Sequence, residues 1–202
     1  MKFLFLSLQA EFFFRKFNFQ QALAHTVEFD DLETFEHTKL KPLSVTLAVE
    51  FETRRILGVE VSIMAAKGTT AEKSRKRYGP RLDERRHGRD RLFRYLKPVV
   101  RENVVLKSDE NPYYPPDVKR HFPDSTHLQY KGQRGSTTGQ GELKRVRFDP
   151  LFSLNHTCAM LRANINRLFR KTWCTTKRAD RLYHHLVLYA QYHNEDLIRR
   201  PA

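Results

Sequence analysis

The sequence predicts a mixed α/β fold in which helices flank a single sheet. Three segments with the composition of β-strands follow one another at residues 27–36, 43–50 and 55–64, and Pro42 and the polar residues around Thr53 punctuate them as hairpin connections. Segments with helical periodicity and one further strand-like run come later in the chain. This order is typical of a mixed sheet covered by helices.

The segment after the hairpins is strongly basic. Within residues 67–97, Gly79 and Pro80 separate a loop from a helix, and we expect that helix to end near Pro98. A solvated, charged helix face explains these basic residues as well as a binding surface does. The short apolar run at residues 104–106 is typical of a buried strand, and its end delivers Asp109 into a proline-rich turn.

The pattern becomes helical after Pro150. Four apolar residues recur at helical spacing: Cys158, Leu161, Ile165 and Leu168. A second, polar stripe lies at a shallow angle to this apolar face and consists of Asn155, Arg162, Asn166 and Arg170. A last helix is expected at roughly residues 179–192. With 202 residues, the chain is long enough for one sizeable core.

The charge of the chain favours a phosphate-rich partner. The formal net charge is +14, and it is unevenly distributed: residues 1–70 carry 8 Lys and Arg against 9 Asp and Glu, whereas residues 71–202 carry 29 against 14. Cations that neutralise phosphates release condensed counterions, so nucleic acid is the expected partner. An anionic membrane surface is the alternative, but the sequence contains no lipidation motif and no long basic amphipathic helix.

The cysteines and the apolar segments indicate a cytoplasmic protein. Cys158 and Cys174 form no CxxC pair, so neither a zinc ribbon nor a disulfide framework is expected. The apolar start of the chain is interrupted by Glu11 and Arg15, which is unlike a signal peptide, and it is shorter than the ~20 residues of a membrane span.

Five carboxylates lie within nine residues of this basic chain: Glu28, Asp30, Asp31, Glu33 and Glu36. Such a cluster repels a polyanion unless a cation lies between them, and a metal ion is the simplest such cation. Cleavage of phosphodiesters by paired divalent ions requires carboxylates from separate strands. Asp30 on the first strand and Asp109 at the end of the later strand fit these roles. Mg²⁺ prefers oxygen ligands and retains waters, so two or three side chains suffice.

Three stretches together resemble DDE-type transposases of insertion sequences: FDDLETFEHTKLKPLSVTLAVEFETRRILG, SDENPYYP and LNHTCAMLRANINRLFRKTWCTTK. The similarity covers about residues 27–194. It implies a ribonuclease H-like fold, with a three-strand antiparallel meander followed by parallel strands, and it maps the first two family aspartates to Asp30, beside Asp31, and to Asp109. Residues 27–202 would then be the catalytic domain, and residues 1–26 a residual N-terminal linker or helix.

The third acidic position of the family departs from the pattern. The family has a glutamate seven positions before an arginine; here the arginine is Arg162, and the matching residue is Asn155. An asparagine offers a metal a carbonyl oxygen without charge. Glu142, in a glycine-rich loop, is the alternative third acid. His156 is a further candidate, as a proton carrier or phosphate donor.

The resemblance also implies the reaction and the partners. Water attacks in line to free a 3′-OH, which then attacks target DNA, with Mg²⁺, or Mn²⁺ in its place, as the cofactor. Four cations near the catalytic helix would contact phosphates: Arg162, Arg167, Arg170 and Lys171. Tyr114 and Tyr113 are candidates for stacking on an unpaired base, whereas Trp173 is better explained by packing.

Three functional readings remain open at the level of sequence. The first is a transposase that works as a homo-oligomer on the transposon ends and target DNA. Nothing before residue 27 resembles the zinc ribbon or helix-turn-helix of such enzymes, so we expect a truncated copy, the second of two frameshifted reading frames or a gene with a misassigned start. The second is a ribonuclease H-like nuclease without strand transfer. The third, which Asn155 favours, is a catalytically degenerate DNA-binding remnant.

Overall fold

The computed structural model describes residues 2–131, 148–168 and 174–198. Five strands form one sheet in the order β3-β2-β1-β4-β5. Their bounds are β1 (Ala24–Phe35), β2 (Pro42–Glu50), β3 (Ile56–Ile63), β4 (Val100–Asp109) and β5 (Thr126–Tyr130). The first three strands pair antiparallel, whereas β4 pairs parallel with β1 and β5 pairs parallel with β4. The predicted mixed sheet is confirmed, and β1 is its central strand.

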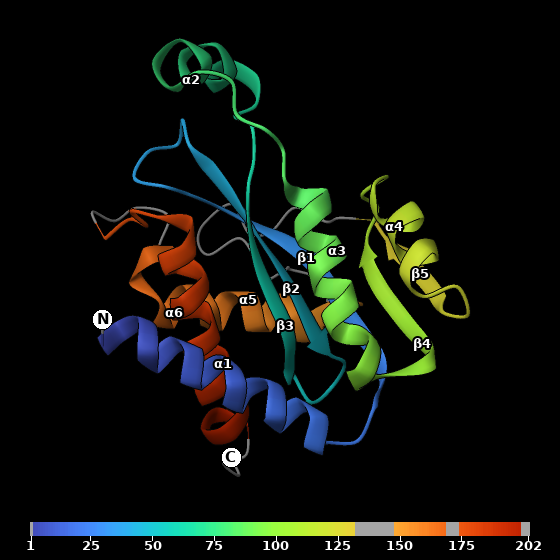
Figure 1. The fold of residues 1–202 in the computed structure, drawn as a ribbon. Helices are drawn as coiled ribbons and strands as arrows, with labels where there is room; N and C mark the ends of the chain where they lie inside the picture. The colour runs from blue at the N-terminus through green and yellow to red at the C-terminus, as the bar shows by residue number, and fades with distance from the viewer. Residues whose placement is uncertain (1, 132–147, 169–173, 199–202) are drawn as a thin grey trace.

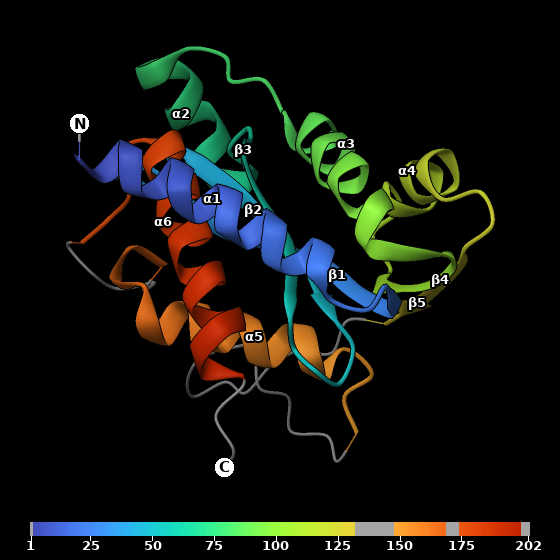
Figure 2. The same cartoon turned by 60° about the horizontal axis from the view of Figure 1, so that its bottom comes forward.

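Helices flank both faces of this sheet (Figures 1 and 2). The α-helices are α1 (Lys2–Gln20), α2 (Ala71–Tyr78), α3 (Arg85–Leu96), α4 (Tyr114–His121), α5 (Phe152–Asn164) and α6 (Ala179–Tyr192). Short helical turns are η1 (Gly68–Thr70), η2 (Lys97–Val99), η3 (Asn166–Leu168) and η4 (His193–Leu197). Among the described helices, none combines the length and the apolar character needed to cross a bilayer.

The alternation of side chains along β1 and β2 creates two hydrophobic clusters. Phe29 and Ala48 belong to the cluster that α3 and α4 cover, whereas Leu32 and Leu47 belong to the cluster that α1, α5 and α6 cover. Successive side chains of a strand point to opposite faces, so these central strands serve both clusters. Almost every residue of β2 is buried as a result.

Several elements differ from the sequence-based expectation. The strand predicted at residues 104–106 is part of the longer β4, which pairs with β1 at Val100 and, after a shift in register, again from Val105 to Lys107. The proline-rich turn after Asp109 leads into α4, whose first turn contains Pro115 and Pro116. Proline is compatible with that position because the first backbone N–H groups of a helix have no partner within it. Neither α2 nor β5 was predicted, and both are short.

Candidate active site

The parallel pairing of β1 and β4 brings Asp30 and Asp109 together. Val27 pairs with Leu106, and Glu28 with Lys107. Two residues further along each strand stand the two aspartates, at the edge of the sheet where β4 ends. Two negative charges in this position repel each other, and this repulsion is among the causes that raise the pKa of Asp30. The sheet therefore joins two residues that are far apart in the sequence.

Asp30 is held by two hydrogen bonds to one carboxylate oxygen. The hydroxyl of Tyr114 donates to Oδ1 over 2.9 Å, and the backbone N–H of Asp31 donates to the same atom over 2.7 Å. These bonds lower the pKa, but burial, followed by repulsion from Asp109, raises it to about 7. Burial also raises the pKa of Tyr114, which keeps its hydroxyl protonated as a donor. A bound cation would favour the ionised form of this carboxylate.

Asp109 and Asp31 have different surroundings. The backbone N–H of Asn111 donates to Oδ1 of Asp109 over 3.1 Å, which fixes the turn that leads into α4. Asp31 points to the opposite face of β1 from Asp30, where the Thr46 hydroxyl donates to its Oδ1 over 2.6 Å and Arg89 lies 3.6 Å from its Oδ2. Asp31 is therefore part of an ion pair with Arg89, and Asp30 is the aspartate of β1 that lies beside Asp109.

Glu28 is a buried member of the acidic cluster, and no specific role was predicted for it from the sequence. Its Oε2 accepts the backbone N–H of Leu154 over 2.8 Å, so it ties β1 to the first turn of α5. Burial raises its pKa to about 7, and Lys107 is one of the groups that lower it. No hydrogen-bond partner of its Oε1 lies in the described part of the chain. Glu28 and Asp30 point to the same face of β1, so Glu28 positions α5 relative to Asp30.

Asn155 occupies the first turn of α5 and contacts an acid that sequence reasoning missed. Its Nδ2 donates to Oδ2 of Asp149 over 2.7 Å, and the other oxygen of Asp149 accepts the backbone N–H of Leu151 over 3.0 Å. The carboxylate of Asp149 is therefore in direct contact with the neutral side chain of Asn155. The signal in the sequence was an aspartate just before Pro150, at the start of the predicted helix. Glu142, the other candidate for the third acid, lies outside the described residues.

His156 is directed toward a cation rather than an acid. Its ring lies 3.4 Å from Nη1 of Arg54. Burial, together with the charge of Arg54, lowers the pKa of this histidine. His156 is therefore neutral at pH 7, which does not suit a phosphate donor that depends on positive charge.

The residues expected to contact DNA are distributed differently from the prediction. Tyr114 is fully buried, with its hydroxyl on Asp30, so its ring is not available to a base; the ring of Tyr113 beside it is exposed. Arg162 is buried at the end of α5, and Arg167 in η3 is half-buried. Three further residues lie outside the described part of the chain: Arg170, Lys171 and Trp173.

The donor atoms near Asp30 fit a hydrated magnesium ion held by two carboxylates. Asp30 and Asp109 supply oxygen ligands from neighbouring strands, and their mutual repulsion would be relieved by a cation between them. Within the described ranges, no group of three or more His, Cys, Asp or Glu is arranged to hold a metal. The candidate metal ligands are accordingly the two aspartates.

Comparisons with known proteins identify no relative. No protein-family model matches the chain, and neither a curated protein nor a solved structure is significantly similar to it.

Proposed function

We propose that this chain is a DDE-type transposase with a ribonuclease H-like fold, which cleaves DNA strands and joins them in a metal-dependent reaction. The observation on which the proposal depends is the pairing of Asp30 with Asp109 at the edge of the sheet. The three-strand meander followed by two parallel strands agrees with the strand order of that fold. The basic excess of the chain supports DNA as the substrate.

Asp30 and Asp109 would hold the metal in this proposal. Bound Mg²⁺ supplies a Lewis acid that polarises the phosphate and lowers the pKa of a water. Tyr114 orients the carboxylate of Asp30 through its hydroxyl, and the N–H of Asn111 orients that of Asp109. Glu28 anchors the first turn of α5, which places the Asn155–Asp149 pair beside the sheet.

The test is nicking and joining of DNA by the purified chain with MgCl₂ or MnCl₂. Asp30→Asn and Asp109→Asn should each lower the nicking of a supercoiled plasmid at least about 100-fold, since each removes a charged ligand. Glu33→Gln is the matched control: this acid lies on the same strand but is exposed and pairs with Lys67. Its activity should equal that of the wild type.

The products separate this proposal from its two alternatives. Recombinant joints between a 3′-OH oligonucleotide and the plasmid support a transposase, whereas nicks without joints indicate a plain nuclease. Asn155, which is neutral and bound to Asp149, favours the third reading, a DNA-binding remnant. Absence of any cleavage, together with an unchanged melting temperature on addition of MnCl₂, would refute the enzyme, and DNA binding by the same inactive chain would support the remnant.

A further inference from the structure

A cavity of about 420 Å³ lies between α3 and α4, close to the candidate active site. Both helices lie side by side in Figures 1 and 2, on the same side of the sheet. Its lining includes four arginines, Arg85, Arg86, Arg89 and Arg120, against two aspartates, Asp83 and Asp117. The lining is therefore positively charged overall, and we call this cavity the α3–α4 pocket.

One buried carboxylate organises the arginines of this pocket. The side chain of Asp117 is only 3% exposed, and its oxygens lie 2.9 Å from Arg89, 2.6 Å from Arg120 and 3.8 Å from Arg86. Arg89 is buried, but the side chains of Arg86 and Arg120 are 67% and 40% exposed. Arg120 also donates to Asp90 over 2.8 Å, so it is shared between two carboxylates. Each guanidinium has five N–H donors, so both exposed arginines keep donors for an incoming anion, and Arg86 is the less engaged of the two.

The rim of the pocket supplies an aromatic ring and a connection to the aspartates. Tyr113 is 64% exposed, although it is a large aromatic residue. Asn111 also lines the pocket, and its backbone N–H donates to the carboxylate of Asp109. Only one residue, Glu110, separates this lining residue from Asp109 along the chain. The pocket therefore borders the turn that follows Asp109 at the end of β4.

We propose that the α3–α4 pocket binds an unpaired DNA strand next to the nucleotide at the aspartate pair. Arg86 and Arg120 hold a backbone phosphate, because guanidinium groups pair with phosphate through two parallel hydrogen bonds. The neighbouring base stacks on Tyr113, as bases do on exposed aromatic rings in single-strand binding sites. The choice of DNA as the ligand rests on the proposed function. The phosphate contact itself needs no metal.

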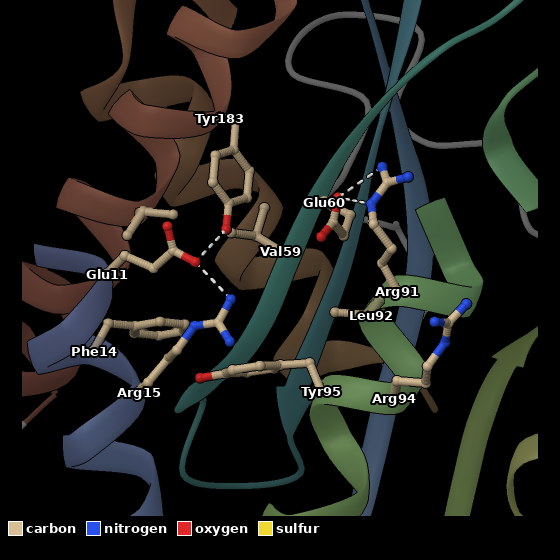
Figure 3. Close-up of a pocket in the computed structure, with 11 residues that line it drawn as sticks. Glu11, Phe14, Arg15, Val59, Glu60, Arg91, Leu92, Arg94, Tyr95 and Tyr183 are labelled. Carbon is tan, nitrogen blue, oxygen red and sulfur yellow. Dashed lines mark hydrogen bonds and ion pairs between the residues drawn. The ribbon is translucent and has the colours of Figure 1, made fainter. Parts of the chain in front are cut away.

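A second cavity, of about 380 Å³, supplies a control for this proposal (Figure 3). There Arg15 pairs with Glu11, Arg91 pairs with Glu60, and Tyr183 donates to Glu11. Arg94 lies at this second cavity, on the same helix as Arg86, and Figure 3 shows its guanidinium apart from these pairs. It is therefore a matched control for the removal of one exposed arginine from α3.

The test is fluorescence anisotropy of a labelled oligothymidine strand of about 12 nucleotides, in EDTA. Arg86→Gln should weaken binding about fivefold or more, whereas Arg94→Gln, with the same loss of charge, should change it less than twofold. Tyr113→Ala should weaken binding about tenfold. Tyr113→Phe should bind as tightly as the wild type, since the phenyl ring still stacks. Tyr192→Ala removes an exposed tyrosine of α6 and is the aromatic control.

The outcomes distinguish this pocket from the proposed reaction. Equal weakening of strand binding by Arg86→Gln and Arg94→Gln, or unchanged strand binding by Tyr113→Ala, would refute the proposed role of the pocket. Duplex DNA of the same length should respond to Arg86→Gln but not to Tyr113→Ala; an equal response of the duplex to Tyr113→Ala would refute stacking on an unpaired base. These binding measurements are made in EDTA and do not depend on cleavage. A failure to cleave DNA therefore refutes only the reaction, and the binding data still test the pocket.

Discussion

At the scale of single residues, Asp30 shows how position changes the chemistry of an ordinary carboxyl group. An aspartate in water ionises near pH 4, but burial and the neighbouring Asp109 raise the pKa of Asp30 to about 7. Tyr114 holds the same carboxylate in place. Strongly perturbed acids are common in functional sites, although ion pairs within a fold also perturb pKa values. A substitution that removes the charge of Asp30 but keeps the shape of its side chain therefore tests the cause of the raised pKa.

Asp30→Asn should stabilise the metal-free protein above neutral pH. Because the folded pKa is raised, the folded state keeps a proton that the unfolded state loses, so wild-type stability falls as pH rises from about 4 to about 7. The asparagine is neutral throughout. Urea unfolding in EDTA at pH 8 should give a higher free energy of unfolding for the variant, by up to about 4 kcal/mol for a shift of about three pKa units.

Urea unfolding of the wild type and of Asp30→Asn at pH 4, and at pH 8 with MgCl₂, can contradict this prediction. The variant and the wild type should converge at pH 4, and MgCl₂ at pH 8 should stabilise the wild type more than Asp30→Asn. Glu28 also has a raised pKa, so some decline with pH should remain in the variant. An equal decline in both proteins would show that Asp30 ionises with an ordinary pKa.

Arg89 is the buried cation on the other face of β1, and we expect it to be needed for folding. It lies 2.9 Å from Asp117 and 3.6 Å from Asp31, and all three side chains are buried. Arg89→Met leaves these acids with one cation fewer, so the free energy of unfolding should fall by about 3 kcal/mol or more. Arg91→Met on the same helix breaks only the half-exposed pair with Glu60 and should cost less than about 1 kcal/mol.

At the scale of elements, the close approach of α3 to the sheet sets the walls of both cavities. A Cβ atom on Gly58 of β3 would lie 2.5 Å from Cδ1 of Leu92 and 3.3 Å from the ring of Tyr95. Both neighbours belong to α3, and Leu92 is fully buried. A glycine at this position therefore allows the helix to pack directly on the backbone of the strand.

Gly58→Ala should accordingly destabilise the protein, by about 1–3 kcal/mol in chemical denaturation, since an added methyl in a packed core forces its neighbours to shift. The double variant Gly58→Ala/Leu92→Ala tests the cause. With Leu92 truncated, the same methyl has space, and the cost of Gly58→Ala should be smaller than in the wild-type background. Additive costs in this cycle would place the effect of Gly58 elsewhere than at α3.

At the scale of the whole molecule, the net positive charge favours association with polyanions. The formal net charge is +14, and all of the basic excess lies after residue 70, in the part that includes α3, α4 and the C-terminal helices. Phosphate contacts release counterions, so DNA affinity should fall linearly with salt concentration on logarithmic axes. The slope reports how many phosphates the protein neutralises, independently of any cleavage.

We expect Arg86→Gln to reduce that slope by about 1 relative to the wild type, measured by anisotropy between about 50 and 200 mM KCl. Arg94→Gln should leave the slope closer to the wild-type value, because Arg94 lies at the other cavity. An affinity that did not change over this range of salt would contradict phosphate binding by the chain as a whole.

The sequence by itself determined the elements that have strong local signals. The three strands of the meander follow from their β-type composition and the turn residues between them, the buried run inside β4 from its apolar residues, and α6 from helical periodicity. All of these are properties of neighbouring positions. Asp30 and Asp109 could be selected because each lies in such a strand. The elements missed, α2, α4 and β5, are short, and in α4 the two prolines suggested a turn.

Only the tertiary structure decided which side chains meet. The parallel register of β1 and β4 brings Asp30 beside Asp109, the fold buries Tyr114 while Tyr113 stays exposed, and Asp149 takes the amide of Asn155. Asp117 likewise gathers arginines from α3 and α4. Some of these contacts join residues that are distant in the chain, and the burial of Tyr114 rather than Tyr113 depends on how the two side chains pack. A local pattern of residues contains no information on burial or packing.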